Sequence, residues 1–314
     1  MADVMQFVFF DFEMLCSNRG MPFEEMEGIR LGAVKYNLET EEVSFFDQYI
    51  QPLNKKPLSS FCKKLTGIID EDLADAQNYK EVFADFLTWV GGVKRSRFFS
   101  WSKSDLTRLQ LDSKLHDVPL TTIKKIEKRY VDFQGLFTKR VTKNNFSVEN
   151  ALKLYGKEFI GEKHNPMYDA YNTLIIYLCF SKEDVASDLI MTKQYILDEV
   201  PTDFTLMNAK IREHFLYDIN EYILEIKEMY KLKDGSKLLK RTQRLVEKYE
   251  NILINRSGIF SRQLELYVRQ LVEFYHELIL SYEEHVLYSS KILVLDEHLI
   301  YRIGSFPKLR LGNK

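Results

Sequence analysis

The feature that most constrains the fold is the order of strand-like and helix-like segments in the first part of the chain. Gln6–Phe12 is an apolar, β-prone run, and two further strand-like segments, Ile29–Tyr36 and Val43–Ile50, are joined by a short polar turn. After this hairpin, helical patterns such as Tyr79–Val90 alternate with short strands such as Arg97–Trp101. This order predicts an α/β fold in which helices pack against a mixed central sheet.

The same signals place the other elements of this region. A short helix is expected over Pro57–Leu65 before a glycine, and a longer helix that begins with proline spans Pro166–Phe180. Two more helices and one short strand complete the prediction: Asp105–His116, Val148–Tyr155 and Arg129–Phe133.

After about residue 182 the pattern changes, because strand signals nearly disappear and long helical periodicities replace them. A chain of 314 residues also exceeds the usual size of a single core. We therefore predict two domains: residues 1–182 with the mixed sheet, and residues 183–314 as a mainly helical C-terminal domain of unknown role.

Apolar residues recur at spacings of three and four along two stretches of this second region, which indicates seams for helix packing. The seam residues are Leu216, Ile219, Ile223, Ile226 and Tyr230, then Leu264, Tyr267, Leu271, Tyr275, Leu278 and Tyr282. Breaks at Asp234–Ser236 and Asn255–Gly258 predict about three long helices, which either form a bundle within the chain or pair with another copy. Ile292–Leu295 and Leu299–Ile303 suggest a closing hairpin, followed by a basic tail from Lys308.

Two acids interrupt the first apolar strand. Residues two apart in a strand point to the same face, so Asp11 and Glu13 would direct both carboxylates to one point, where divalent cations balance their charge. The alternative is that the strand ends at Phe10 and the two acids are solvated. Burial of two acids in a central strand would need a compensating partner.

Two later segments carry further acids. Asp169 lies on the first turn of the predicted helix from Pro166, with His164 just ahead of it, although a first-turn acid is also favoured by the helix dipole alone. Asp105 follows a strand at a helix start, where N-capping by Ser104 or by Asp105 itself is an equally good explanation. Each segment is ambiguous when it is taken singly.

Taken in order, these residues resemble the DEDDh branch of the DnaQ-like exonuclease superfamily, and within it the KapD-like and ERI-like exonucleases, over roughly residues 5–182. Asp11 and Glu13 match the first motif, Asp105 the second, and His164 with Asp169 the third. Connecting motifs of that family also have counterparts in order: Gly32–Lys35, Gln51–Pro52, Leu58–Cys62, Leu65–Ile68 and Asp169–Thr173. One departure is Arg30, which stands in the hairpin where relatives usually carry an acid.

The resemblance implies an RNase H-like fold, two bound Mg²⁺ or Mn²⁺ ions, and 3′-to-5′ hydrolysis of single-stranded nucleic acid to nucleoside 5′-monophosphates, with RNA preferred over DNA. Asp11 is expected to bridge the ions, Glu13 and Asp169 to complete one site, and Asp105 to hold the other partly through water. Imidazole ordinarily titrates near neutral pH, so His164 is expected to take the proton from the attacking water.

Substrate contacts are expected close to the first motif. The residues assigned to them are Phe12, Met14, Leu15 and Trp101, with Phe12 or Met14 stacked on the terminal base. Core packing is the competing role for Phe12.

The second region offers a possible guide for nucleic acid. One helical face carries a basic stripe of Lys237, Lys240, Arg241, Arg244 and Lys248. A solvated surface is the default explanation, and a stripe that leads RNA to the active site is the sharper one. Docking of a protein partner, or self-association through the helices, is a further possibility.

The net charge of −2 argues against wholesale wrapping of nucleic acid, so any polyanion contact is expected to be local. We find no apolar run of membrane-spanning length and no secretory signal, and we expect a cytoplasmic protein without membrane contact. The rival functions are a regulatory binding module that keeps the exonuclease fold, and a DNA-editing exonuclease.

Overall fold

The structure is a computed structural model that describes residues 3–306, so the basic tail from Lys308 lies outside the described residues. It divides into two compact units. The sheet unit contains the chain through Lys139 together with Asn144–Lys182, and the helical unit contains Arg140–Lys143 and the chain from Glu183 onward. Within residues 3–306, no helix combines the length and the apolar composition needed to cross a membrane.

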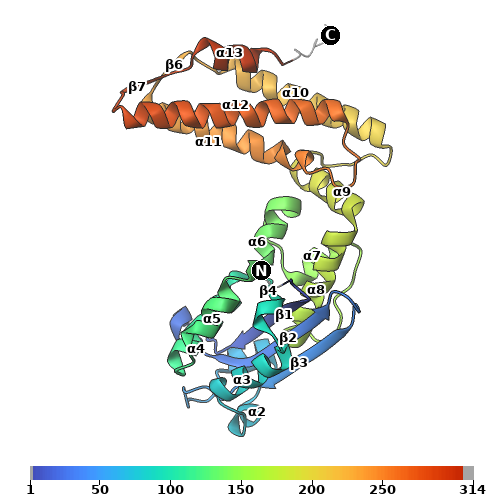
Figure 1. Ribbon diagram of the computed structural model, residues 1–314, viewed down its shortest axis with the longest axis vertical. Coiled ribbons are helices and arrows are strands. Elements are labelled where there is room, and N and C mark those ends of the chain that lie inside the picture. The colour runs from blue at the N-terminus through green and yellow to red at the C-terminus, as the bar shows by residue number, and fades with distance from the viewer. Residues whose placement is uncertain (1–2, 307–314) are drawn as a thin grey trace. The chain divides into compact units, whose positions relative to one another are not determined.

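A five-stranded sheet forms the centre of the sheet unit, in the order β3-β2-β1-β4-β5 (Figure 1). Its strands are β1 (Gln6–Met14), β2 (Gly28–Asn37), β3 (Val43–Tyr49), β4 (Ser96–Ser100) and β5 (Tyr130–Asp132). β1, β2 and β3 pair antiparallel, whereas β4 runs parallel to both β1 and β5. The predicted mixed sheet is confirmed, and β1 lies at its centre.

Strand alternation divides β1 between two cores. Val8, Phe10 and Phe12 enter a core that also contains residues of α3 (Tyr79–Val90), α4 (Lys103–Leu115) and α5 (Leu120–Glu127). Phe7 and Phe9 pack instead against Tyr177 of α8 (Pro166–Lys182), on the opposite face. Because Asp11 and Glu13 follow the alternation of Phe7 and Phe9, their side chains lie on the α8 face.

A glycine permits α8 to approach this face closely. A Cβ on Gly32 of β2 would lie 2.0 Å from the backbone nitrogen of Met167 and 2.2 Å from the carbonyl carbon of Pro166. No side chain fits at this position, so glycine allows the first turn of α8 to rest directly on the strand. Gly32 pairs with Asp11 in the sheet, and this contact therefore brings the start of α8 next to the acids of β1.

The remaining helices of the sheet unit are short. They are α1 (Ser60–Thr66), α2 (Asp70–Ala74), α6 (Phe133–Phe137) and α7 (Val148–Leu154). The glycine stop predicted for the first of them is confirmed, since Gly67 adopts the left-handed conformation at the end of α1.

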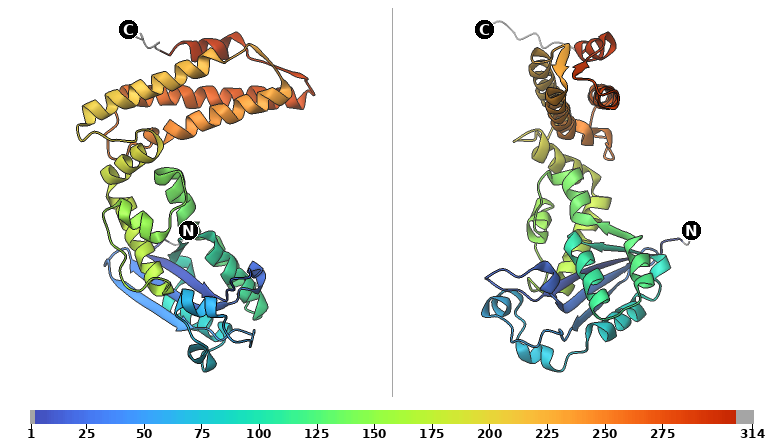
Figure 2. Two further views of the ribbon diagram at one scale, coloured as in Figure 1. Left: turned by 180° about the vertical axis from the view of Figure 1, so that it is seen from behind. Right: turned by 90° about the vertical axis from the view of Figure 1, so that its left-hand side faces the viewer.

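The helical unit consists mainly of long helices, seen again from two other sides in Figure 2. Its helices are α9 (Asp184–Tyr195), α10 (Phe204–Leu224), α11 (Leu232–Tyr249), α12 (Arg262–Leu287) and α13 (Glu297–Gly304). The seam residues Leu216, Leu264 and Leu271 are buried in the core of this unit. Of the two arrangements left open by the sequence, these seams form a bundle within the chain.

Two sequence predictions for this unit are wrong. The break predicted at Asp234–Ser236 lies inside α11, where Gly235 packs so closely on Leu293 that an added Cβ would approach its side chain to 2.9 Å. The predicted closing hairpin does not form either. Its first half is β7 (Ile292–Val294), which pairs with β6 (Met229–Lys231), and its second half is the helix α13.

Candidate active site

Three carboxylates meet where β1 and α8 touch. Asp11 and Glu13 extend from β1, and Asp169 extends from the first turn of α8. One oxygen of each lies within 4.8 Å of the others, which is the spacing of a set able to share a metal ion. The solvated alternative for Asp11 and Glu13 is not what the fold shows, since β1 continues to Met14 and both acids take part in its pairing with β2.

Asp105 joins this group through Asp11. It is 3% exposed, on the first turn of α4, and its carboxyl group is hydrogen-bonded to that of Asp11. The backbone N–H of Phe12 donates to Asp105 Oδ1 at 3.4 Å. The N-cap of α4 is Ser102, whose hydroxyl accepts from the backbone of Ser104, so neither Ser104 nor Asp105 is the cap.

Burial and mutual repulsion make these acids hard to ionise. Burial raises the pKa of Glu13 to about 8, with repulsion from Asp169 as the next cause, and raises the pKa of Asp105 to about 7. The pKa of Asp169 rises to about 6 through burial, while a hydrogen bond from the backbone of His164 opposes the rise. The pKa of Asp11 rises well above its usual value, because it is buried and faces the other three carboxyl groups.

This donor set fits divalent metal ions. Four carboxyl groups from β1, α4 and α8 supply hard oxygen ligands, which Mg²⁺ and Mn²⁺ prefer. Burial is the main cause of the raised pKa values, and a bound divalent ion would favour the charged form of these carboxyl groups.

His164 lies at the entrance to α8 in a left-handed backbone conformation, with φ of 61°. The backbone of His164 is hydrogen-bonded to the Asp169 carboxylate, and its imidazole is exposed. Within residues 3–306 this imidazole makes no hydrogen bond, so both ring nitrogens remain available. The structure therefore brings His164 beside Asp169 through the backbone and leaves its side chain at the surface.

The residues predicted to contact substrate are mostly held in cores. Phe12 is 4% exposed and packs on the face of β1 opposite Asp11, and Met14 packs against the same core. Leu15 is buried in a second small core, and Trp101 packs between Phe133 and Phe137. These contacts favour core packing as the role of Phe12. They do not support base stacking by any of the four side chains.

The basic stripe on α11 is largely neutralised within its own unit. Three of its five cations form ion pairs: Lys237 with Asp234, Arg241 with Glu225, and Lys248 with Asp218. Lys240 and Arg244 are exposed and form no ion pair in the part of the chain that the structure describes. The part of the stripe that remains free for a guide role is therefore these two residues.

The sheet also positions Arg30 near the carboxylates. The sequence identified this residue only as a difference from the family pattern. Arg30 lies directly opposite Glu13 in the β1–β2 pairing, and its charge opposes the rise in the pKa of Glu13. Asp47 on β3 binds its guanidinium through two hydrogen bonds. The pairing of β2 with β3 creates this contact, and the sequence alone does not specify that register.

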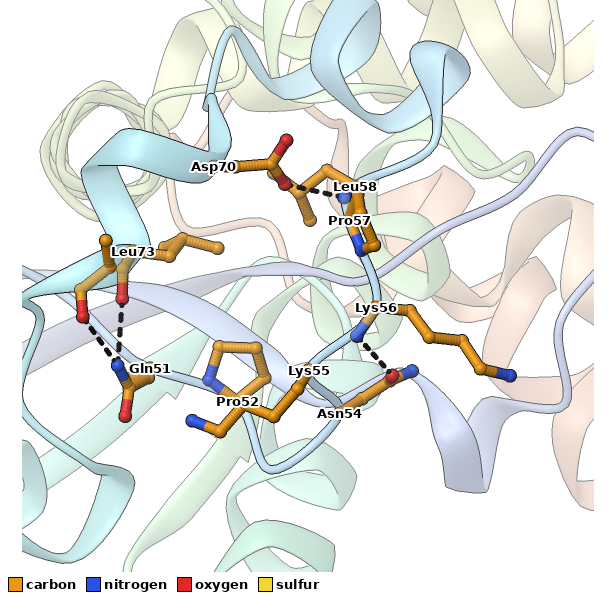
Figure 3. Close-up of a pocket in the computed structure, with 10 residues that line it drawn as sticks. Gln51, Pro52, Asn54, Lys55, Lys56, Pro57, Leu58, Asp70 and Leu73 are labelled. Carbon is orange, nitrogen blue, oxygen red and sulfur yellow. Dashed lines mark hydrogen bonds between the residues drawn. The ribbon is translucent and has the colours of Figure 1, made fainter.

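A hollow of about 270 Å³ lies elsewhere in the sheet unit, beside the loop that follows β3 (Figure 3). The amide of Gln51 donates to the carbonyl oxygens of Leu73 and Ala74 at one side, and the backbone N–H of Leu58 donates to Asp70 at the other. None of the clustered acids lines this hollow. It is therefore separate from the carboxylate site.

Comparison with known proteins places this geometry among nucleases. The family model for RNase T, described as an exonuclease, matches residues 8–177. The chain is 25% identical over 218 residues to ERI1 exoribonuclease 2 of Homo sapiens, and the alignment covers 61% of this chain and 30% of that protein. It is 27% identical over 175 residues to 3'-5' exoribonuclease 1 of Homo sapiens, which covers 52% of this chain and 48% of that protein.

Among solved structures, the nuclease domain of 3'hExo, a DEDDh family member bound to rAMP, aligns with a TM-score of 0.52 at 22% identity. The alignment covers 58% of this chain and 95% of that domain, and it is a likeness of fold. The matched region spans less than half of the length of both curated relatives.

Proposed function

The chain belongs to the RNase T family of exonucleases, in the ERI-like branch of the DEDDh enzymes, and on that premise we propose that it removes nucleotides from the 3′ end of single-stranded nucleic acid. One observation carries this proposal. Carboxyl groups from three separate elements converge on one point, where burial and mutual repulsion raise the pKa of Asp11. Phosphodiester hydrolysis by divalent ions requires such a set of hard ligands.

In the proposed mechanism each acid has one role. Asp11, which faces the other three carboxyl groups, would hold both ions, Glu13 and Asp169 would hold one of them, and Asp105 would hold the other partly through water. When bound, the two ions supply Lewis-acid stabilisation of the phosphate and activation of water. His164 would accept a proton from the attacking water, because its exposed imidazole lies on the loop whose backbone is hydrogen-bonded to Asp169.

We propose RNA as the preferred substrate and Mg²⁺ or Mn²⁺ as the ions. The support for RNA is the pair of relatives described as exoribonucleases, together with the rAMP bound in the related nuclease domain. The products are nucleoside 5′-monophosphates. Lys240 and Arg244 of α11 are proposed as a weak guide for the nucleic acid, since they are the two cations of the stripe that carry no ion pair within residues 3–306.

The test is hydrolysis of matched RNA and DNA oligomers, labelled at the 5′ end, in Mg²⁺ and in Mn²⁺. The expected result is a ladder that shortens by single nucleotides from the 3′ end, faster for RNA than for DNA. A 3′-blocked oligomer is the substrate control. Chromatography of the products from a uniformly labelled oligomer checks that nucleoside 5′-monophosphates are released.

The matched protein control is His164→Ala, which removes the proposed base and leaves every carboxylate in place. We expect its hydrolysis to fall by about a hundredfold or more, with nucleic acid still bound. Unchanged hydrolysis in this variant would remove the assigned role of His164. Absence of mononucleotide release from the wild type with either metal would favour the regulatory binding module instead.

A further inference from the structure

The sheet places a cation beside the carboxylate cluster. Arg30 of β2 is paired directly with Glu13 of β1 on one side and with Tyr49 of β3 on the other. Directly opposed residues in antiparallel strands project to the same face, with Cβ atoms about 5 Å apart. The guanidinium of Arg30 therefore lies on the face of the sheet that carries Asp11 and Glu13.

This guanidinium is held in one orientation. Its Nε donates to Asp47 Oδ1 at 2.8 Å and its Nη2 to Asp47 Oδ2 at 2.6 Å, and the group lies 4.8 Å from the centre of the Tyr49 ring. Its Nη1 makes no hydrogen bond to any residue between 3 and 306, and the side chain stays 14% exposed. One edge of the fork is thus fixed by the protein, while the other edge remains available to a ligand.

Stability alone does not account for this arrangement. A partly exposed ion pair contributes little net stability, because water weakens the attraction and fixing two side chains in one geometry costs conformational entropy. A cation beside a site for divalent ions is also repelled once those ions bind. The repulsion is offset when the ligand that accompanies the ions is an anion, and a nucleic-acid strand brings one negative charge with each phosphate.

We propose that Arg30 contacts a phosphate of the bound strand beside the carboxylate cluster, with Asp47 and Tyr49 fixing its guanidinium for that contact. The inference rests on the proposed function, because that function supplies the strand. It assigns Arg30 to substrate binding, together with Asp47 and Tyr49 as positioning residues.

The first test compares Arg30→Gln with the double variant Arg30→Gln/Asp47→Asn. A contact with phosphate predicts that both lose about tenfold or more in kcat/KM, since each lacks the cation. A structural role predicts that the double variant recovers, because it leaves no carboxylate unpaired. Arg30→Lys, which keeps the charge but not the fork, should recover part of the loss.

Lys182→Gln is the matched control for charge. Lys182 forms an ion pair with Glu41 in the same unit, beyond the opposite end of β2 from Arg30, and its loss should leave kcat/KM unchanged. Circular dichroism and thermal melting of each variant check that the fold is kept. Recovery of activity in the double variant would overturn the inference.

The second test measures binding separately from hydrolysis, with His164→Ala protein, Mg²⁺ and single-stranded RNA. Adding Arg30→Gln should reduce the slope of log affinity against log salt by about 0.7, the value for one phosphate contact on a single strand. Oligomers with one neutral methylphosphonate at each of the last three linkages then locate the contact, since neutralising the contacted phosphate should cost nothing further in Arg30→Gln.

The two proposals fail in different ways. A wild type that binds RNA but never hydrolyses it sinks the proposed function and leaves the binding test of Arg30 intact. An active wild type whose Arg30→Gln variant keeps the full salt slope, and shows no coupling at any of the three linkages, overturns the inference alone.

Discussion

The two units of the molecule treat buried carboxylates in opposite ways. In the helical unit Asp188 is fully buried, and its two oxygens are bonded to the guanidinium of Arg140 and to the hydroxyl of Ser257. In the sheet unit Asp105 is 3% exposed and Asp11 is half-buried, and the charged groups that act on Asp11 are other carboxyl groups. The first arrangement supplies its counter-charge within the protein, and the second does not.

The difference lies between individual sites and not between the α/β fold and the helical fold. Asp112 also lies buried in the sheet unit, and there Arg108 binds it at 2.8 Å while the backbone N–H of Gly28 donates to its other oxygen. The sheet unit therefore also contains a buried acid that is paired with a cation of the protein. An unpaired cluster of buried acids is costly, and such clusters persist where a ligand of opposite charge binds.

The sharpest way to break this comparison is Asp11→Asn. We expect hydrolysis to fall by roughly a thousandfold or more, because the carboxylate proposed to hold both ions is lost. In chelator-treated protein the same substitution should raise the melting temperature, since it removes a repelled, buried acid from the cluster. Rate assays and melting curves with and without Mg²⁺ measure both effects.

Asp188→Asn is the counterpart in the helical unit, and it should have the opposite effect on stability. It keeps the size of the side chain but leaves the guanidinium of Arg140 buried without a carboxylate. Loss of one partner from a buried ion pair costs about 3–5 kcal/mol of unfolding free energy. Urea denaturation followed by circular dichroism checks this value, with Arg140→Met/Asp188→Leu as the neutral control that should recover most of the loss.

These two variants test the comparison together. If Asp11→Asn destabilises the chelated protein as Asp188→Asn does, the acids of the sheet unit have ordinary structural partners. The carboxylate cluster would then no longer be a candidate site for cation binding.

The pH dependence of stability separates the two units by a smaller effect. The folded pKa values of Asp169, Asp105 and Glu13, at about 6, 7 and 8, lie above the values of unfolded acids. The folded state therefore binds more protons than the unfolded state between about pH 4 and pH 8, and the stability of chelated protein falls as pH rises through this window.

Calorimetry of chelated protein between pH 5 and pH 8 measures this fall, which we expect to be roughly 3 °C for each kcal/mol lost in a unit of this size. Mg²⁺ should flatten the dependence, because bound ions replace the protons. A melting temperature that rises with pH in the absence of metal would contradict the raised pKa values.

Much of the fold follows from local signals in the sequence. Tyr79–Val90 is predicted and observed with the same bounds, because Asn78 caps its start and Gly91 ends it in the left-handed conformation. The segment around Asp296 is harder to predict from the sequence, since Asp296 suggests a turn but is the N-cap of α13. The strand β7 pairs with residues about sixty positions earlier, and no local pattern specifies such a partner.

The site shows the same division. Alternation along β1 suffices to place Asp11 and Glu13 on one face, and the first-turn position suffices for Asp169. The role of Arg30 depends on the registers of two strand pairs, which bring it against Glu13 and Asp47. Local sequence does not fix those registers, so the acids are predictable from the chain and the cation beside them is not.

The smallest expected effect concerns the basic face of α11. Lys240 and Arg244 form no ion pair with any residue from 3 to 306, unlike the rest of the stripe, so Lys240→Glu/Arg244→Glu should weaken RNA binding a few-fold, and chiefly at low salt. Lys193→Glu/Lys210→Glu reverses two exposed charges elsewhere in the helical unit and is the matched control. If both double variants bind RNA with the wild-type salt slope, the stripe is a solvated surface. Nucleic acid would then be bound by groups of the sheet unit and not by the cations of α11.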